Sequence, residues 1–268
     1  MKNNPIGVFD SGIGGLTVVK EIINVLPNER IMYLGDTARV PYGTRDTEII
    51  AKFALQLAVF LLEKNVKALV VACNTISATA LSEIKKISPV PVIDVISPTI
   101  AEAVRQTKTN TIGIIGTRAT IKSNVYQTEI QKLQPDISII SKACPLFVPL
   151  AEEGWLAHPA TELIAKEYLA DIQKGNPDTL ILGCTHYPLL KQSIQKVMNE
   201  HVMLIDSAHP TAMELKKVLL SHDLLTDAAS PTHTFYVTDK AEQTSRTADI
   251  FFDNHFPGNL EKITLPLI

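Results

Sequence analysis

Two cysteines stand at matching places in the chain, each directly after an apolar run of strand length. Cys73 follows Leu69–Ala72, and Cys184 follows Leu180–Gly183. In both cases the next residues are polar and suit the first turn of a helix, where unpaired N–H groups and the helix dipole favour a thiolate over a thiol. A free thiol has a pKa of about 8.5, so a modest decrease would leave a useful thiolate fraction at neutral pH. The two positions therefore predict a pair of reactive thiols.

Two thiols that face one ligand from opposite sides could invert a stereocentre. One thiolate would remove a proton from one face of a carbon atom, while the opposite thiol donates a proton to the other face. The roles exchange in the reverse reaction. A single base tends to return the proton to the face that it left, so a pair of thiols suits racemisation better than one.

Other known functions of cysteine explain the two matching cysteines and their polar neighbours less completely. A zinc site could be built from four side chains, Cys73, Cys184, His186 and Asp10. However, Cys-x-His is not a usual spacing of zinc ligands. A cysteine hydrolase could pair Cys184 with His186 but would leave Cys73 without a role. A pyridoxal enzyme needs a lysine on a loop that faces the site, and none stands out. A cysteine can also be a small buried apolar residue, which is the interpretation that we adopt for Cys144.

A glycine-rich turn, Asp10–Gly15, lies between an apolar run and a helical stretch. A dinucleotide pyrophosphate would bind at such a place, with Asp36 as the acid that binds the ribose. The GxGxxG pattern fails because Thr17 stands where the third glycine should be, and Asp10 puts a carboxylate where phosphate would approach. No GxxxxGK[ST] sequence occurs, which excludes a P-loop. The turn either contributes to a different site or only changes the direction of the chain.

The elements that must position these residues form a repeating pattern. Amphipathic stretches of helical length, such as Thr47–Lys64, Ala160–Lys174 and Thr211–Ser221, alternate with short β-branched runs. This alternation predicts a parallel α/β fold with its active site beyond the carboxyl ends of the strands. The predicted strands are Ile6–Phe9, Ile31–Leu34, Leu69–Ala72, Pro91–Ile93, Thr111–Ile115, Ile137–Ile140, Thr179–Leu182, Met203–Ile205 and Phe235–Val237.

Three segments of the first half resemble segments of the second half, in the same order. The pairs are Ile6–Ser11 with Ile112–Thr117, Leu69–Thr75 with Leu180–His186, and Val92–Thr99 with Leu204–Thr211, at offsets of 106, 111 and 112 residues. The near-constant offset predicts an internal duplication. We therefore expect two pseudo-symmetric parallel-sheet α/β domains, residues 1–95 plus 208–268 and residues 96–207, with the active site in the cleft between them.

Composition excludes several classes of protein. The 268 residues include 25 Lys and Arg against 28 Asp and Glu, a net charge of −3 that argues against a nucleic-acid or anionic-membrane surface. No apolar run approaches the roughly 18 residues that a membrane span needs. The N-terminal residues lack a signal-peptide pattern, so a cytoplasmic protein is expected. Three cysteines without CxxC spacing indicate reduced thiols and not a disulfide scaffold.

Five motifs in order carry a resemblance that covers essentially the whole chain. They are Asp10–Gly15, Val40–Gly43, Ala72–Thr75, Pro149–Gly154 and Gly183–Pro188. Together they resemble the glutamate racemase family, within the cofactor-independent aspartate/glutamate racemases. The resemblance implies that two thiols interconvert L- and D-glutamate without a metal or organic cofactor, and that D-glutamate supplies peptidoglycan synthesis. Members of the family usually form homodimers.

The resemblance also implies roles for individual residues. Cys73 would act on D-glutamate with the support of Asp10, and Cys184 would act on L-glutamate with the support of Glu152 and His186. The expected substrate-binding residues are Asp10, Ser11, Tyr42, Gly43, Asn74, Thr75, Thr185 and His186. Taken alone, Glu152 could lie in a solvated loop, and His186 and several of the others could be helix caps.

Two alternatives remain open from the sequence. An aspartate racemase of the same superfamily would differ by one methylene in its substrate, a difference that depends on the depth of the pocket. A non-catalytic two-domain protein could use the same cleft to bind a small molecule, and it would need neither Cys73 nor Cys184.

Overall fold

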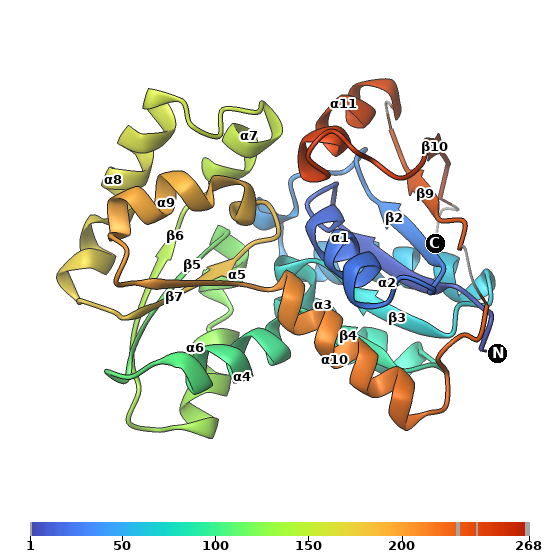
Figure 1. The fold of residues 1–268 in the computed structure, drawn as a ribbon, viewed down its shortest axis with the longest axis horizontal. Coiled ribbons are helices and arrows are strands. Elements are labelled where there is room, and N and C mark those ends of the chain that lie inside the picture. The colour runs from blue at the N-terminus through green and yellow to red at the C-terminus, as the bar shows by residue number, and fades with distance from the viewer. Residues whose placement is uncertain (1, 229–230, 240, 266–268) are drawn as a thin grey trace.

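The strands form two parallel sheets in the computed structural model of the chain, which describes residues 2–228, 231–239 and 241–265 (Figure 1). In spatial order, the first sheet contains β10 (Leu260–Lys262), β9 (Thr234–Val237), β2 (Ile31–Gly35), β1 (Ile6–Asp10), β3 (Ala68–Val71) and β4 (Val92–Asp94). The second contains β6 (Ser138–Ala143), β5 (Thr111–Gly116), β7 (Thr179–Gly183) and β8 (Met203–Asp206). The prediction of an α/β fold with two parallel sheets is confirmed.

The two sheets share one topology. The order β2-β1-β3-β4 in the first matches the order β6-β5-β7-β8 in the second, with the segments that resemble each other in equivalent strands. In the first sheet β1 and β3 end together, because Phe9 pairs with Val71. In the second, β5 and β7 end together, because Gly116 pairs with Gly183. The residues that follow each pair of strands therefore lie side by side.

Helices surround both sheets (Figure 1). They are α1 (Leu16–Val25), α2 (Thr47–Glu63), α3 (Asn74–Ile87), α4 (Ile96–Gln106), α5 (Arg118–Lys122), α6 (Val125–Leu133), α7 (Phe147–Glu152), α8 (Pro159–Lys174), α9 (Lys191–Met198), α10 (Ala208–Ser221) and α11 (Ala241–Phe251), with short 3₁₀ helices η1 (Tyr42–Thr44) and η2 (Tyr187–Leu190). Within the described residues, none of these helices is long and apolar enough to cross a membrane.

Burial follows from the spacing of apolar residues. All five residues of β1 are buried, as expected for a central parallel strand covered on both faces. Helix α3 packs against α2 and buries Ile76, Ala80 and Ile84, which recur every four residues on one face. This packing fixes the start of α3, and with it Cys73, at the end of β3.

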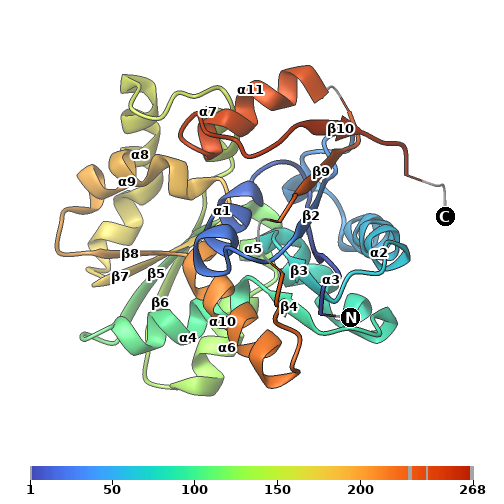
Figure 2. The ribbon, with the colours of Figure 1, turned by 45° about the vertical axis from the view of Figure 1, so that its right-hand side comes forward.

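The last quarter of the chain returns to the first sheet. Strand β9 pairs with β2, with Phe235 beside Tyr33, and β10 pairs with β9 at the edge of the sheet. Helix α10 packs on α1, and α11 lies near the loop that contains α7 (Figure 2). The division of the chain into domains at residues 95/96 and 207/208 stays a prediction.

Candidate active site

A cavity of about 340 Å³ lies beyond the carboxyl ends of strands from both sheets. Residues that follow β1 and β3 line it together with residues that follow β5 and β7. A larger open groove of about 700 Å³ runs along α4, β8 and α10 and contains none of the predicted site residues. The smaller cavity contains all of them: Asp10, Ser11, Tyr42, Gly43, Cys73, Asn74, Thr75, Glu152, Cys184, Thr185 and His186.

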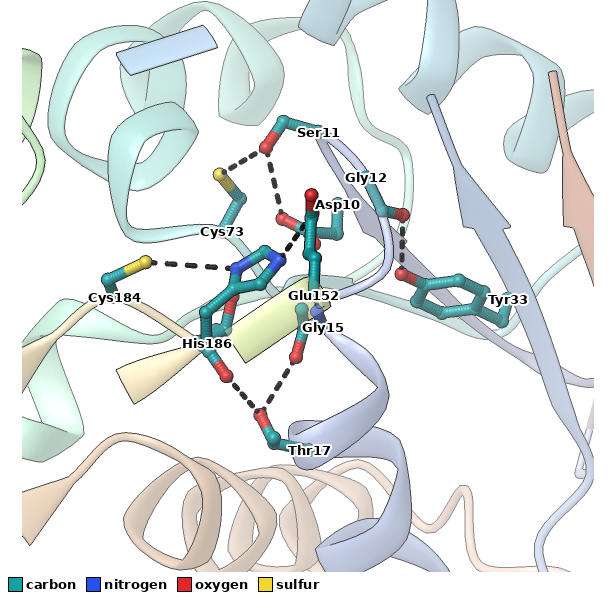
Figure 3. Close-up of polar contacts among 12 residues, drawn as sticks. Asp10, Ser11, Gly12, Gly15, Thr17, Tyr33, Cys73, Glu152, Cys184 and His186 are labelled. Atoms are coloured by element: carbon teal, nitrogen blue, oxygen red, sulfur yellow. Dashed lines mark hydrogen bonds and ion pairs between the residues drawn. The ribbon is translucent and has the colours of Figure 1, made fainter. Parts of the chain in front are cut away.

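Cys73 is buried at the N-cap of α3, in a short chain of polar contacts (Figure 3). Its Sγ lies 3.4 Å from Ser11 Oγ, and the Ser11 hydroxyl lies 3.4 Å from Asp10 Oδ1, to which it donates. The N–H of Gly15 donates to Asp10 Oδ2 at 2.8 Å. The first turn of α1 therefore orients the carboxylate that accompanies this thiol.

The electrostatics of Cys73 differ from the sequence-based expectation. Burial, and then the nearby Asp10 carboxylate, raise the pKa of the Cys73 thiol well above its usual range. The expectation that the start of a helix alone would favour a thiolate is therefore wrong for Cys73 in this structure, because burial outweighs the effect of the Ile76 N–H in the first turn of α3, which lowers the pKa. Burial also raises the pKa of Asp10, and the His186 charge and the Gly15 N–H only partly oppose that increase.

Cys184 has different partners. His186 Nδ1 lies 3.9 Å from Cys184 Sγ, and His186 Nε2 lies 2.9 Å from Glu152 Oε1. Burial lowers the pKa of His186, but its hydrogen bonds to Cys184 and Glu152 outweigh burial and raise that pKa to about 10. The imidazole is therefore protonated at neutral pH and can donate to both partners. A positive charge at this distance stabilises negative charge on the Cys184 sulfur.

The glycine-rich turn is part of this site and does more than reverse the chain. A Cβ on Gly14 would lie 2.6 Å from Thr185 Oγ1 and 2.5 Å from His186 Cε1, closer than side-chain atoms can approach. Only glycine allows the turn after β1 to lie against the loop after β7. The site thus depends on close contact between Gly14 and two residues that lie 171 and 172 positions further along the chain.

Several predicted substrate-binding side chains already have partners within the protein. The Tyr42 hydroxyl donates to Asp36, whose carboxylate is fully buried. Asn74 Oδ1 accepts from the Tyr126 hydroxyl at 2.6 Å. These hydrogen bonds hold the Tyr42 and Asn74 side chains in place in the walls of the cavity.

Asp36 has internal partners that do not involve a ribose. Besides the Tyr42 hydroxyl, it accepts from Arg39 Nε at 2.6 Å and from Thr238 Oγ1 at 2.9 Å. The carboxylate therefore anchors the segment that carries η1.

The cavity also contains residues that the sequence analysis did not single out. Thr117 lines it and lies 2.9 Å from Thr75, oxygen to oxygen. It is the counterpart of Ser11 in the duplicated segments, so the offset of 106 residues was an available signal. Arg118 adds a guanidinium at the exposed rim, where no sequence pattern distinguished it from a surface residue of a helix. Pro145 and Val148 supply part of the apolar wall.

Across residues 2–228, 231–239 and 241–265, no three His, Cys, Asp or Glu side chains gather in an arrangement that could hold a metal ion.

Comparisons with known proteins agree with the motifs. Residues 6–215 match the family model described as Asp/Glu/Hydantoin racemase. A glutamate racemase of Syntrophus aciditrophicus is 46% identical over 263 residues, which cover 98% of this chain and 97% of the relative. One from Enterococcus faecalis is 48% identical over 245 residues, 91% of this chain and 90% of the relative.

Solved structures of glutamate racemases are also similar to this chain. The crystal structure of glutamate racemase from Francisella tularensis in complex with D-glutamate has a TM-score of 0.93 and 44% identity, and covers 98% of both chains. That of a Bacillus anthracis glutamate racemase isoform has a TM-score of 0.96 and 39% identity, with full coverage of both chains.

Proposed function

This chain belongs to the Asp/Glu/hydantoin racemase family, and we propose that it interconverts L- and D-glutamate by proton transfer between two thiols. It is an amino-acid racemase, hence an isomerase. The observation that carries the proposal is the placement of Cys73 and Cys184 at equivalent strand ends on one cavity. Each thiol has its own charged neighbour, which is Asp10 for Cys73 and His186 for Cys184.

The reaction in the direction from L to D begins at Cys184. Its thiolate removes the α-proton of L-glutamate, and the electron pair stays on the α-carbon as a carbanion. The Cys73 thiol then donates its proton to the opposite face, which gives D-glutamate, a Cys184 thiol and a Cys73 thiolate. The raised pKa of Cys73 favours a thiol there, which is the acid that this direction needs, and the His186 imidazole lies beside the sulfur that acts as the base.

Binding of the substrate uses groups that do not compete as bases. The N–H groups at the starts of η1 and α3 would donate to the carboxylates, and the Thr185 hydroxyl and Ser11 would bind the α-amino and α-carboxylate groups. Arg118 lies at the rim, where its guanidinium suits a carboxylate. We propose no metal or organic cofactor for this chemistry.

The biological setting is also part of the proposal. The product D-glutamate would serve peptidoglycan synthesis, in a cytoplasmic homodimer, as the resemblance of the five motifs to glutamate racemases implies. Support comes from curated relatives named glutamate racemase that match most of the chain at 46–48% identity.

A direct assay tests the proposal against both alternatives. Purified protein is incubated with L-glutamate or L-aspartate, and optical rotation is followed to equilibrium. We expect rotation to decay to zero with L-glutamate and to change far more slowly with L-aspartate, whose shorter side chain loses contacts in the cavity. Faster decay with L-aspartate would favour an aspartate racemase. Binding of glutamate without any decay would favour a non-catalytic binding protein.

A further inference from the structure

Thr17 joins the two thiol-bearing parts of the site without touching the cavity. It lies in the first turn of α1, is 8% exposed, and stands where a dinucleotide-binding turn would need glycine. Its Oγ1 lies 2.9 Å from the carbonyl oxygen of Gly14 and 3.1 Å from that of Thr185 (Figure 3). The second contact crosses from α1, the helix that follows β1, to the loop that follows β7.

The Thr185 carbonyl belongs to the short segment between Cys184 and His186. Strand β7 ends at Gly183, so the sheet hydrogen bonds do not hold this segment. Thr185 is buried, and a buried carbonyl needs a donor. Among the hydrogen bonds of the described residues, that donor is the Thr17 hydroxyl, which shares its single proton between the carbonyl oxygens of Thr185 and Gly14.

Close packing supports the same contact. Because Gly14 has no Cβ, the turn approaches Thr185 and His186 to within van der Waals distance. The same turn supplies the Gly15 N–H that orients Asp10. One rigid turn therefore contacts the supporting group of each thiol.

We infer that Thr17 is a positioning residue, which holds the Cys184–His186 segment in register with Asp10 and Cys73. The inference rests on the proposed racemase function. Thr17 acts through the Thr185 backbone, so its loss should disturb proton transfer at Cys184 more than at Cys73. A hydrogen bond that only stabilised the fold would show no such bias.

The test compares Thr17→Val, which removes the hydroxyl at nearly constant volume, with Thr17→Ser, which keeps it. The matched control is Thr99→Val, since Thr99 is also buried and donates to Val95 O at 2.6 Å at the start of α4, away from the cavity. The measurement is kcat/KM for protiated and α-deuterated L- and D-glutamate.

For Thr17→Val we expect kcat/KM to fall by about 10- to 100-fold, because misplacement of a reacting group slows the reaction. The fall is equal in both directions, because the free enantiomers have equal energy. The deuterium isotope effect should rise with L-glutamate, where abstraction by Cys184 becomes more rate-limiting, and fall with D-glutamate. Thr17→Ser should restore both values, and Thr99→Val should leave them unchanged. If Thr17→Val does not fold, Thr17→Ala provides the same comparison.

Isotope effects that stay at wild-type values, or that shift in the same sense with both enantiomers, would overturn the positioning role. So would an equal loss in Thr99→Val, which would indicate a general effect of removing a buried hydroxyl. The wild-type enzyme is assayed first. If it does not racemise glutamate, the proposed function fails. If it is active and Thr17→Val behaves like it, only the positioning role of Thr17 is refuted.

Discussion

Replacing either Cys73 or Cys184 with alanine is expected to lower glutamate racemisation by about 10²- to 10⁴-fold, the contribution of a positioned acid or base. Inversion needs a base on one face and an acid on the other, and each variant removes one of the two groups. The expected loss is similar for both variants, because neither thiol can serve both faces of the α-carbon.

Cys144→Ala is the matched control for this prediction. Cys144 is buried like the other two, and its thiol donates to the Lys142 carbonyl at a sulfur–oxygen distance of 3.7 Å, but it does not line the cavity. Burial raises the pKa of Cys144 to about 12, so this thiol stays protonated at neutral pH. Initial rates of optical rotation are measured for all three variants, with thermal unfolding as a check on folding. Substantial inversion by Cys73→Ala or Cys184→Ala would refute the two-thiol mechanism.

Replacing Asp10 or His186 with asparagine should reduce kcat/KM by about 10²-fold or more while shifting isotope effects in opposite senses. Asp10 lies on the Cys73 side of the cavity, and His186 bonds to Cys184. Asp10→Asn should therefore enlarge the α-deuterium isotope effect with D-glutamate more than with L-glutamate. His186→Asn should do the reverse, and so should Glu152→Gln, because Glu152 accepts from His186.

The ratio of kcat/KM in the two directions cannot reveal these roles, since the equilibrium constant between free enantiomers is one. Isotope effects are therefore measured with protiated and α-deuterated substrate in each direction. A shift in the same sense for Asp10→Asn and His186→Asn would show that the supporting groups are not divided between the thiols, even if racemisation itself is established.

Local sequence patterns predicted the main elements of the fold and the candidate site. An apolar run followed by a cysteine and polar residues correctly placed Cys73 and Cys184 at the ends of β3 and β7. The duplicated segments occupy equivalent strands in the two sheets, and the same comparison could have identified Thr117 as the counterpart of Ser11. These features depend on periodicity and spacing within short segments, which the sequence displays directly.

Features that depend on contacts between distant segments could not be predicted. Nothing near Asn74 in the sequence indicates that the Tyr126 hydroxyl donates a hydrogen bond to the Asn74 side-chain oxygen. Gly14 and Thr17 belong to a turn that looked unsuited to dinucleotides, and only the packed structure shows that Thr185 and His186 lie against it. The raised pKa of Cys73 likewise follows from burial and from the nearby Asp10. The position of Cys73 at the start of a helix indicates neither of these.

The central claim is that two thiols on one cavity, Cys73 and Cys184, exchange protons with opposite faces of the α-carbon. The most direct test is to incubate the wild-type enzyme with protiated L-glutamate in D₂O, stop at low conversion, separate the enantiomers and measure α-deuterium in each by mass spectrometry. The proton on the donating thiol comes from solvent, so we predict that each newly formed D-glutamate carries one deuterium and that the remaining L-glutamate stays protiated. D-glutamate that retains the original protium, or L-glutamate that gains deuterium as fast as D-glutamate forms, would show that one base serves both faces and would contradict the two-thiol account.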